Sequence, residues 1–214
     1  MWLLRSKAAN PAGTVMLCPG GGYQTLEMNR EGANTAQALN DMGFDVAVLE
    51  YHIGAGANVR DLALADALQA FRLLKTNGGD FGLHSARIDI MGYSAGGHLA
   101  TRAVAKLGPD EQPDDVILVY PAYLNETKPG TSTTAFALPA KPGRLFVAMA
   151  VNDDAGWIKG CETYVQAWKD AGGYTDFHLL PRGGHGFGMD AKASDSVEDW
   201  PDLLKAFLAS GQSK

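Results

Sequence analysis

Short runs of apolar and β-branched residues alternate with longer helical patterns along the chain, and this alternation constrains the fold more than any other feature. The strand-like runs cover residues 14–18, 44–51, 88–91, 116–120, 145–151 and 174–180. The helical patterns cover residues 31–42, 58–75, 95–106, 161–171 and 200–209. Strands separated by helices of this length usually pair in parallel. The sequence therefore predicts an α/β fold around a mainly parallel sheet.

Composition restricts the partners of the chain. It has 214 residues, with 18 Lys and Arg against 24 Asp and Glu, so that the formal net charge at pH 7 is −6. With no basic run, this balance argues against nucleic acid and against an anionic membrane surface as partners. A chain of this length is expected to form one domain, residues 1–214.

The amino terminus and the apolar runs bear on localisation. No apolar stretch approaches the roughly 20 residues of a membrane span. The opening segment is charged too early for a signal peptide, so the chain as written is expected to be cytoplasmic. If a leader had been removed, a secreted or periplasmic location would follow. Cys18 and Cys161 match no disulfide framework or zinc spacing, and we expect them to be buried thiols.

The strongest motif is Gly92-Tyr93-Ser94-Ala95-Gly96, which matches G-x-S-x-G between an expected strand and an expected helix. In this context the serine sits on a sharp turn, with its hydroxyl above the carboxyl edge of the sheet. The two glycines leave room for the close backbone approach that such a turn needs. We therefore expect Ser94 to be a nucleophile.

A serine hydroxyl needs a base, and the chain offers five histidines. His98 lies four residues after Ser94 on the same expected helix, where it cannot easily meet the hydroxyl. His84 and His178 have structural positions, and His52 follows the second strand early in the chain. His185 stands in a glycine-rich loop directly after the last strand, and we expect it to be the base.

The third member of a triad orients the imidazole. Asp153 and Asp154 follow the fifth expected strand, so that serine, acid and histidine occur in the order typical of α/β hydrolases. The acid is expected to be followed by two residues and then a turn into the next helix. This pattern favours Asp154, with Asp153 as the alternative.

A glycine run after the first expected strand supplies amides for an oxyanion. Gly21 and Gly22, together with the amide of Ala95, are the expected oxyanion hole. The alternative interpretation of this glycine run is a nucleotide-binding loop. It is disfavoured because the chain has neither G-x-G-x-x-G nor G-K-[ST].

With these motifs in order, the chain resembles α/β-hydrolase serine esterases of the acetyl-xylan-esterase-like and hormone-sensitive-lipase-like groups. The four motifs that carry the resemblance are P-G-G-G-Y at residues 19–23, G-Y-S-A-G-G-H at residues 92–98, D-D at residues 153–154 and G-G-H-G-F-G at residues 183–188. The resemblance implies a three-layer α/β-hydrolase fold with helices on both faces of the sheet and a minimal cap.

The same resemblance implies a function: hydrolysis of short-chain acyl esters, commonly acetyl groups on sugars, through a Ser-His-Asp triad and an acyl-enzyme. The expected substrate is a small-molecule or oligosaccharide ester, with no cofactor and no metal. The chain departs from the family pattern after Asp154, where Trp157 stands. Trp157 and Tyr23 are therefore expected to stack on the alcohol part of the substrate. The alternatives are a peptidase or amidase of the same fold, or a non-catalytic binding module.

Overall fold

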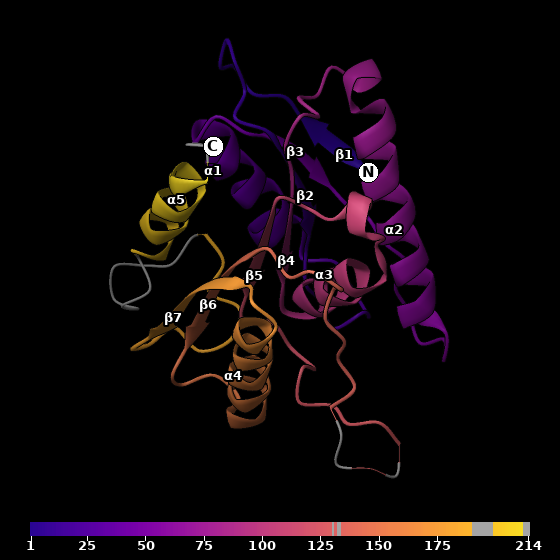
Figure 1. The fold of residues 1–214 in the computed structure, drawn as a ribbon, viewed down its shortest axis with the longest axis vertical. Coiled ribbons are helices and arrows are strands. Elements are labelled where there is room, and N and C mark those ends of the chain that lie inside the picture. Colours follow the sequence, from indigo (N-terminus) through magenta and orange to yellow (C-terminus); the bar gives the residue numbers. More distant parts are fainter. Residues whose placement is uncertain (130, 132–133, 190–198, 212–214) are drawn as a thin grey trace.

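The computed structural model describes residues 1–129, 131, 134–189 and 199–211. Within this part of the chain, seven strands form one sheet in the order β1-β3-β2-β4-β5-β6-β7 (Figure 1). All neighbouring strands are parallel except β1, which runs antiparallel to β3. The strands are β1 (Trp2–Leu4), β2 (Thr14–Cys18), β3 (Asp45–Val48), β4 (Ile88–Tyr93), β5 (Asp115–Val119), β6 (Arg144–Ala150) and β7 (Tyr174–Leu180). The mainly parallel α/β sheet is as predicted.

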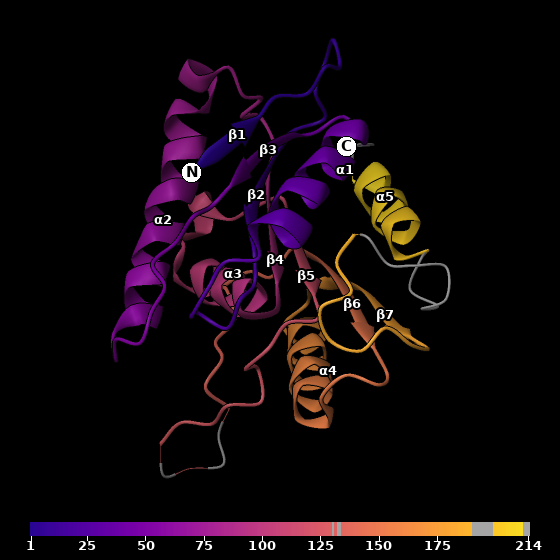
Figure 2. The same ribbon diagram turned by 180° about the vertical axis from the view of Figure 1, so that it is seen from behind.

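Helices cover both faces of this sheet, as Figure 1 and Figure 2 show from opposite sides. The α-helices are α1 (Asn34–Asp41), α2 (Val59–Asn77), α3 (Ser94–Lys106), α4 (Ala155–Asp170) and α5 (Trp200–Ser210). Three shorter turns are the π-helical η1 (Met28–Ala33) and the 3₁₀ turns η2 (Gly78–Phe81) and η3 (Pro109–Glu111). No helix in the described ranges is long and apolar enough to cross a bilayer.

Alternation along the strands creates two apolar cores, one on each face. In β2, Met16 and Cys18 pack with side chains of α2, α3 and α4, whereas Val15 and Leu17 pack with side chains of α1 and α5. All four side chains are fully buried, because a parallel strand covered by helices on both sides has no solvent face. The result is the expected three-layer arrangement.

Several elements have other bounds than the sequence predicted: α4 begins at Ala155 rather than at residue 161, α2 extends to Asn77 rather than to residue 75, and β3 ends at Val48 rather than at residue 51. Two further differences have clear structural causes. The helical pattern at residues 31–42 is divided between η1 and α1, because the first turn has π-helical geometry. Strand β1 was not predicted; it is a three-residue edge strand, and only its pairing with the distant β3 makes it a strand. Cys18 and Cys161 are free and buried, as expected.

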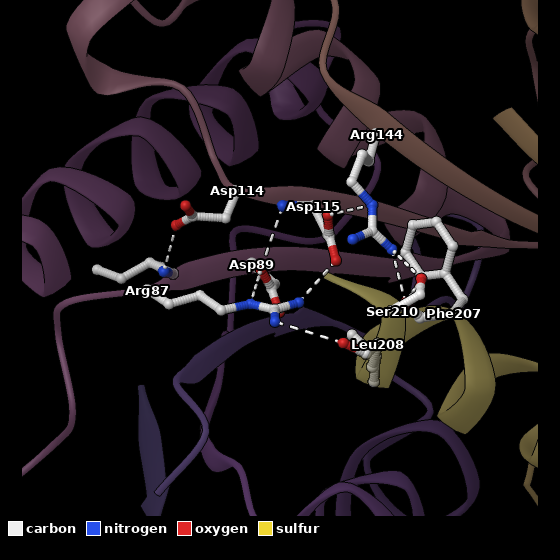
Figure 3. Close-up of polar contacts among 9 residues, drawn as sticks. Arg87, Asp89, Asp114, Asp115, Arg144, Phe207, Leu208 and Ser210 are labelled. Carbon is white, nitrogen blue, oxygen red and sulfur yellow. Dashed lines mark hydrogen bonds and ion pairs between the residues drawn. The ribbon is translucent and has the colours of Figure 1, made fainter. Parts of the chain in front are cut away.

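The amino ends of the strands carry an ionic cluster (Figure 3). Arg87 lies between Asp89 and Asp115, with nitrogen–oxygen distances of 3.1 and 2.6 Å, and Arg144 reaches Asp115 at 3.3 Å. Both arginines also donate to carbonyls in the last turn of α5, Arg87 to Leu208 and Arg144 to the residue before it. The carboxyl ends of the strands form the opposite edge. There the segments after β2, β4, β5, β6 and β7 gather, which is where ligands bind in folds of this kind.

Candidate active site

Ser94 occupies the turn between β4 and α3 in a strained conformation. Its φ is 49°, a left-handed value that side-chain-bearing residues adopt rarely. The flanking glycines explain how the turn is tolerated: a Cβ at Gly92 would collide with the Gly96 carbonyl, and a Cβ at Gly96 with the Cys18 carbonyl. The local sequence therefore imposes this turn and presents the hydroxyl at the carboxyl edge.

His185 reaches Ser94 from the loop after β7. Its Nε2 lies 2.7 Å from Ser94 Oγ, within hydrogen-bond distance. The loop is held from a second direction, because Arg30 Nη1 donates to the Gly186 carbonyl at 2.9 Å. The structure thus brings together the expected nucleophile and the expected base, which are 91 residues apart in the chain.

The carboxylate beside His185 belongs to Asp153. Its Oδ2 and Oδ1 lie 2.9 and 3.1 Å from His185 Nδ1, and its side chain is completely buried. Ser94, His185 and Asp153 therefore form an unbroken chain of hydrogen bonds.

The expectation that Asp154 would hold the histidine is wrong. Asp154 is the N-cap of α4, and its Oδ1 accepts the backbone N–H of Trp157 at 2.9 Å. Aspartate is among the preferred N-cap residues because it satisfies a free amide of the first turn. The residue directly before a helix therefore turns toward that helix, and the residue before it faces the site. The N-cap preference alone does not distinguish two aspartates; the start of α4 at Ala155 decides which of them is the cap.

The expected oxyanion donors flank the serine. Gly21 and Gly22 line a cavity of about 450 Å³ that Ser94 and His185 also line. Both glycines have positive φ, 123° and 65°, and a Cβ at Gly21 would collide with the Thr25 carbonyl. Ala95 is the second residue of α3, where a backbone N–H has no acceptor within the helix. Gly21 and Gly22 thus line the same cavity as Ser94, and Ala95 directly follows Ser94 in the chain.

Of the two aromatic residues expected to contact the substrate, one lies on the cavity wall and one lies in the core. Trp157 lines the cavity, with its ring centroid 4.6 Å from that of His185. Tyr23 does not: it is 1% exposed and its hydroxyl pairs with Nδ1 of His98 at 2.9 Å. The expectation of a substrate-stacking Tyr23 is therefore wrong, because the loop after β2 turns this ring into the core.

The cavity wall is instead completed by Tyr123, which the sequence interpretation missed. Its ring stacks on Tyr23 at 6.2 Å and meets Trp157 edge to face at 5.9 Å. Tyr123 lies in the segment of residues 121–143, which is longer than most connections and for that reason is a candidate functional loop, with a surface insertion as the alternative. Residues 130, 132 and 133 of that segment lie outside the described residues.

Glu31 was missed as well. It is 3% exposed, yet it also lines the cavity. Burial raises the pKa of its carboxyl, and hydrogen bonds from Tyr120 and Gly20 oppose that rise. The sequence pattern carried no signal for this position, because the inward direction of Glu31 depends on the π-helical geometry of η1, which the pattern at residues 31–42 did not indicate.

His98 is structural, as expected from its place on the helix. Burial lowers its pKa to about 3, and the cations Arg60 and Arg102 lower it further. Its neutral ring meets the rings of Tyr23 and Tyr123 edge to face. Among the residues that the structure describes, no three His, Cys, Asp or Glu side chains are grouped to hold a metal ion.

Comparison with known proteins identifies the family of the chain. A family model described as BD-FAE matches residues 3–117, slightly more than half of the chain. The chain belongs to the BD-FAE family. Among curated proteins, an acetylxylan esterase from Xylanibacter ruminicola is 27% identical over 228 aligned positions, which cover 94% of this chain and 47% of that protein. The chain thus spans about half the length of the curated relative that it matches.

Solved structures extend the agreement to the fold. MGS-M1, an α/β-hydrolase enzyme from a deep-sea metagenome library of the Medee basin, is 27% identical with a TM-score of 0.79, over 95% of this chain and 86% of that one. An acetyl ester-xyloside bifunctional hydrolase from Caldicellulosiruptor lactoaceticus is 22% identical with a TM-score of 0.83, over 97% and 87%. The α/β-hydrolase fold and the resemblance to acetyl-xylan-esterase-like enzymes are therefore confirmed.

Proposed function

We propose that this BD-FAE family member is a serine esterase in which Ser94, His185 and Asp153 form the catalytic triad. The observation that carries the proposal is the hydrogen-bonded chain from Ser94 Oγ through His185 to Asp153, beside a cavity that Ser94, His185 and the glycine loop after β2 line together. The esterase names of the relatives described above support carboxylic ester hydrolysis.

The first half of the reaction is acyl transfer to the serine. His185 Nε2 takes the proton of Ser94 Oγ while the oxygen attacks the ester carbonyl, forming a tetrahedral oxyanion. The amides of Gly21, Gly22 and Ala95 donate to this oxyanion as its charge develops. The ester C–O bond then breaks, the imidazolium gives its proton to the leaving alcohol, and the acyl group remains on Ser94.

The second half repeats the steps with water. His185 takes a proton from water, whose oxygen attacks the acyl-enzyme, and the carboxylic acid leaves as Ser94 regains its proton. Throughout, Asp153 accepts a hydrogen bond from Nδ1–H of His185, which fixes the tautomer with a free Nε2 and stabilises the imidazolium. Because the Asp153 side chain is fully buried, little water competes for this contact.

We further propose short acyl groups, acetyl above all, on a carbohydrate alcohol. Two features support this assignment. The rings of Tyr123 and Trp157 meet edge to face on the cavity wall, and aromatic faces of this kind suit the flat apolar side of a sugar. The curated relative is named an acetylxylan esterase.

A series of p-nitrophenyl esters from C2 to C12 tests the acyl part. If the pocket cannot bury added methylenes, each one forgoes about 0.8 kcal/mol of favourable transfer, and a closed end excludes longer chains. We expect kcat/KM to be highest for acetate or propionate and to fall beyond butyrate. A maximum at C8 or longer would contradict the short-acyl assignment.

The alcohol part is tested by acetate release from acetylated xylo-oligosaccharides. Ser94→Ala is the control in both assays. The esterase proposal itself would be overturned if the wild-type protein released no acid from any ester and instead hydrolysed amides or bound esters without hydrolysing them.

A further inference from the structure

A buried carboxylate outside the triad connects the two loops on which the proposed chemistry depends. Glu31 lies in the π-helical turn η1, between the glycine loop after β2 and the histidine loop after β7. Single π-helical turns are rare and frequently occur at functional sites, because the wider turn redirects a side chain. Here it directs Glu31 inward, at 3% exposure.

Both oxygens of Glu31 accept hydrogen bonds. Oε2 accepts the backbone N–H of Gly20 at 2.6 Å, and Oε1 accepts the hydroxyl of Tyr120 at 2.8 Å. The Tyr120 oxygen in turn accepts the backbone N–H of Gly188 at 3.0 Å. A continuous path therefore runs from the glycine loop, through one carboxylate and one phenol, to the loop that carries His185.

Packing around this path leaves little freedom. A Cβ at Gly20 would lie 2.6 Å from Glu31 Oε2 and 2.9 Å from Ser94 Cβ, so this backbone is held directly between the two side chains. The Tyr120 ring meets the His185 ring edge to face at 5.0 Å. A shift of the Glu31 side chain would therefore displace both the glycine loop after β2 and the loop that carries His185.

We infer that Glu31 is a positioning residue that fixes the glycine loop and the histidine loop relative to Ser94. This inference rests on the proposed esterase function. Because the Gly20 N–H is bound to Glu31, the peptide plane between Pro19 and Gly20 is fixed. This holds the start of the glycine loop, so that the amides of Gly21 and Gly22 keep their direction toward the oxyanion.

The role requires a carboxylate rather than any polar side chain. Gly20 and Tyr120 both donate, so both oxygens must accept, and an ionised carboxyl does this. An amide has one accepting atom, so Glu31→Gln keeps one of the two contacts and directs an NH₂ group at the other donor. The misplacement of a donor by a fraction of an ångström weakens a transition-state contact more than a ground-state one.

The test uses Glu31→Gln with Asp45→Asn as matched control. Asp45 is 1% exposed and its two oxygens likewise accept two backbone amides, those of Ser6 and His84, each at 2.7 Å. It lies at the start of β3, at the amino edge of the sheet. Asp45 therefore matches Glu31 in burial, in charge and in the number of hydrogen-bond donors that it accepts, but it lies away from the proposed active site.

Two readouts are measured for each folded protein. One is kcat and KM for p-nitrophenyl acetate. The other is the rate at which a fluorophosphonate modifies Ser94, a step that forms an Oγ–P bond, expels fluoride and needs the base and the oxyanion donors but no ester turnover. We expect Glu31→Gln to lower kcat and the modification rate about 10- to 100-fold with KM within about twofold, because loss of one oxyanion donor outright costs about 10²- to 10³-fold. Asp45→Asn is expected to change both rates less than twofold per folded molecule.

Tyr120→Phe gives a second test, should Glu31→Gln fail to fold. It keeps the ring beside His185 and removes the link to Gly188, and we expect both rates to fall about 3- to 10-fold. The double variant should fall less than the product of the single losses, because both changes break the same path.

The outcomes separate this inference from the esterase proposal. Glu31→Gln with wild-type rates per folded molecule overturns the positioning role and leaves the esterase intact. Wild-type protein that reacts with the fluorophosphonate and hydrolyses no ester, with Glu31→Gln slowed, supports the positioning role and overturns the esterase. Wild-type protein inert in both assays overturns both.

Discussion

Asparagine substitutions at the adjacent Asp153 and Asp154 distinguish the proposed triad aspartate from the N-cap of α4. Asp153→Asn puts an amide where a carboxylate now accepts a hydrogen bond from Nδ1–H of His185 at 2.9 Å. If the amide NH₂ faces His185, Nδ1 must become the acceptor and Nε2 carries the proton. A protonated Nε2 cannot take the proton of Ser94, so the base is disabled while the site keeps its shape.

The expected magnitudes differ by orders of magnitude. A triad aspartate replaced by asparagine lowers kcat by about 10⁴, which is about 5.5 kcal/mol of transition-state stabilisation. Asp154→Asn should leave kcat within about twofold, because asparagine caps a helix about as well as aspartate and the Trp157 amide keeps its acceptor.

The assay is kcat/KM for p-nitrophenyl acetate, with the thermal unfolding midpoint measured for each variant. The two substitutions are the same chemical change one residue apart, so each controls for the other. A larger loss in Asp154→Asn, or an Asp153→Asn enzyme within tenfold of wild type, would refute the assignment of Asp153.

Three further predictions follow from the described contacts. Ser94→Ala is expected to lower kcat by at least about 10⁴ with little change in the unfolding midpoint, because a single hydroxyl is removed; a variant within tenfold of wild type would contradict a serine nucleophile. Trp157→Ala is expected to raise KM severalfold for acetylated xylo-oligosaccharides and little for p-nitrophenyl acetate; the exposed Phe81→Ala at the opposite edge is its control, and equal KM values would remove Trp157 from the sugar site. Burial raises the pKa of Asp89 to about 7, against an opposing effect of Arg87, so the folded chain holds a proton that the unfolded chain releases near pH 4. The stability that this protonated carboxyl contributes is therefore present below pH 4 and lost as the pH rises to 7. Urea titrations at several pH values should show that the free energy of unfolding declines less steeply over this range in Asp89→Asn than in wild type. Parallel declines in the two proteins would refute the raised pKa.

The sequence could predict those parts of the fold and site that depend on local backbone chemistry. The strand at residues 14–18 and the helix after Ser94 occur as expected, since apolar runs and glycine turns act within a few residues. The conformation of Ser94 is similarly local, because Gly92 and Gly96 are the positions where no Cβ fits. The glycine-rich loop after β7 likewise made His185 the expected base.

The sequence could not decide which side chains point into the site. Tyr23 and Tyr123 are both aromatic residues in loops, yet the first packs beneath the second, and the residues that determine this order lie 100 positions apart. Strand β1 depends in the same way on a partner more than 40 residues away.

Asp153 and Glu31 show most clearly which properties the sequence determines and which the tertiary structure decides. Two consecutive aspartates have the same chemistry, and their roles differ because α4 begins at Ala155 and takes Asp154 as its cap. Glu31 resembles any helix-surface glutamate until the sheet brings Gly20 and Tyr120 to its two oxygens. The sequence determined which reactive groups are present and which turns present them, and the tertiary structure decided their partners, because hydrogen bonds between distant segments form only when the whole sheet is assembled.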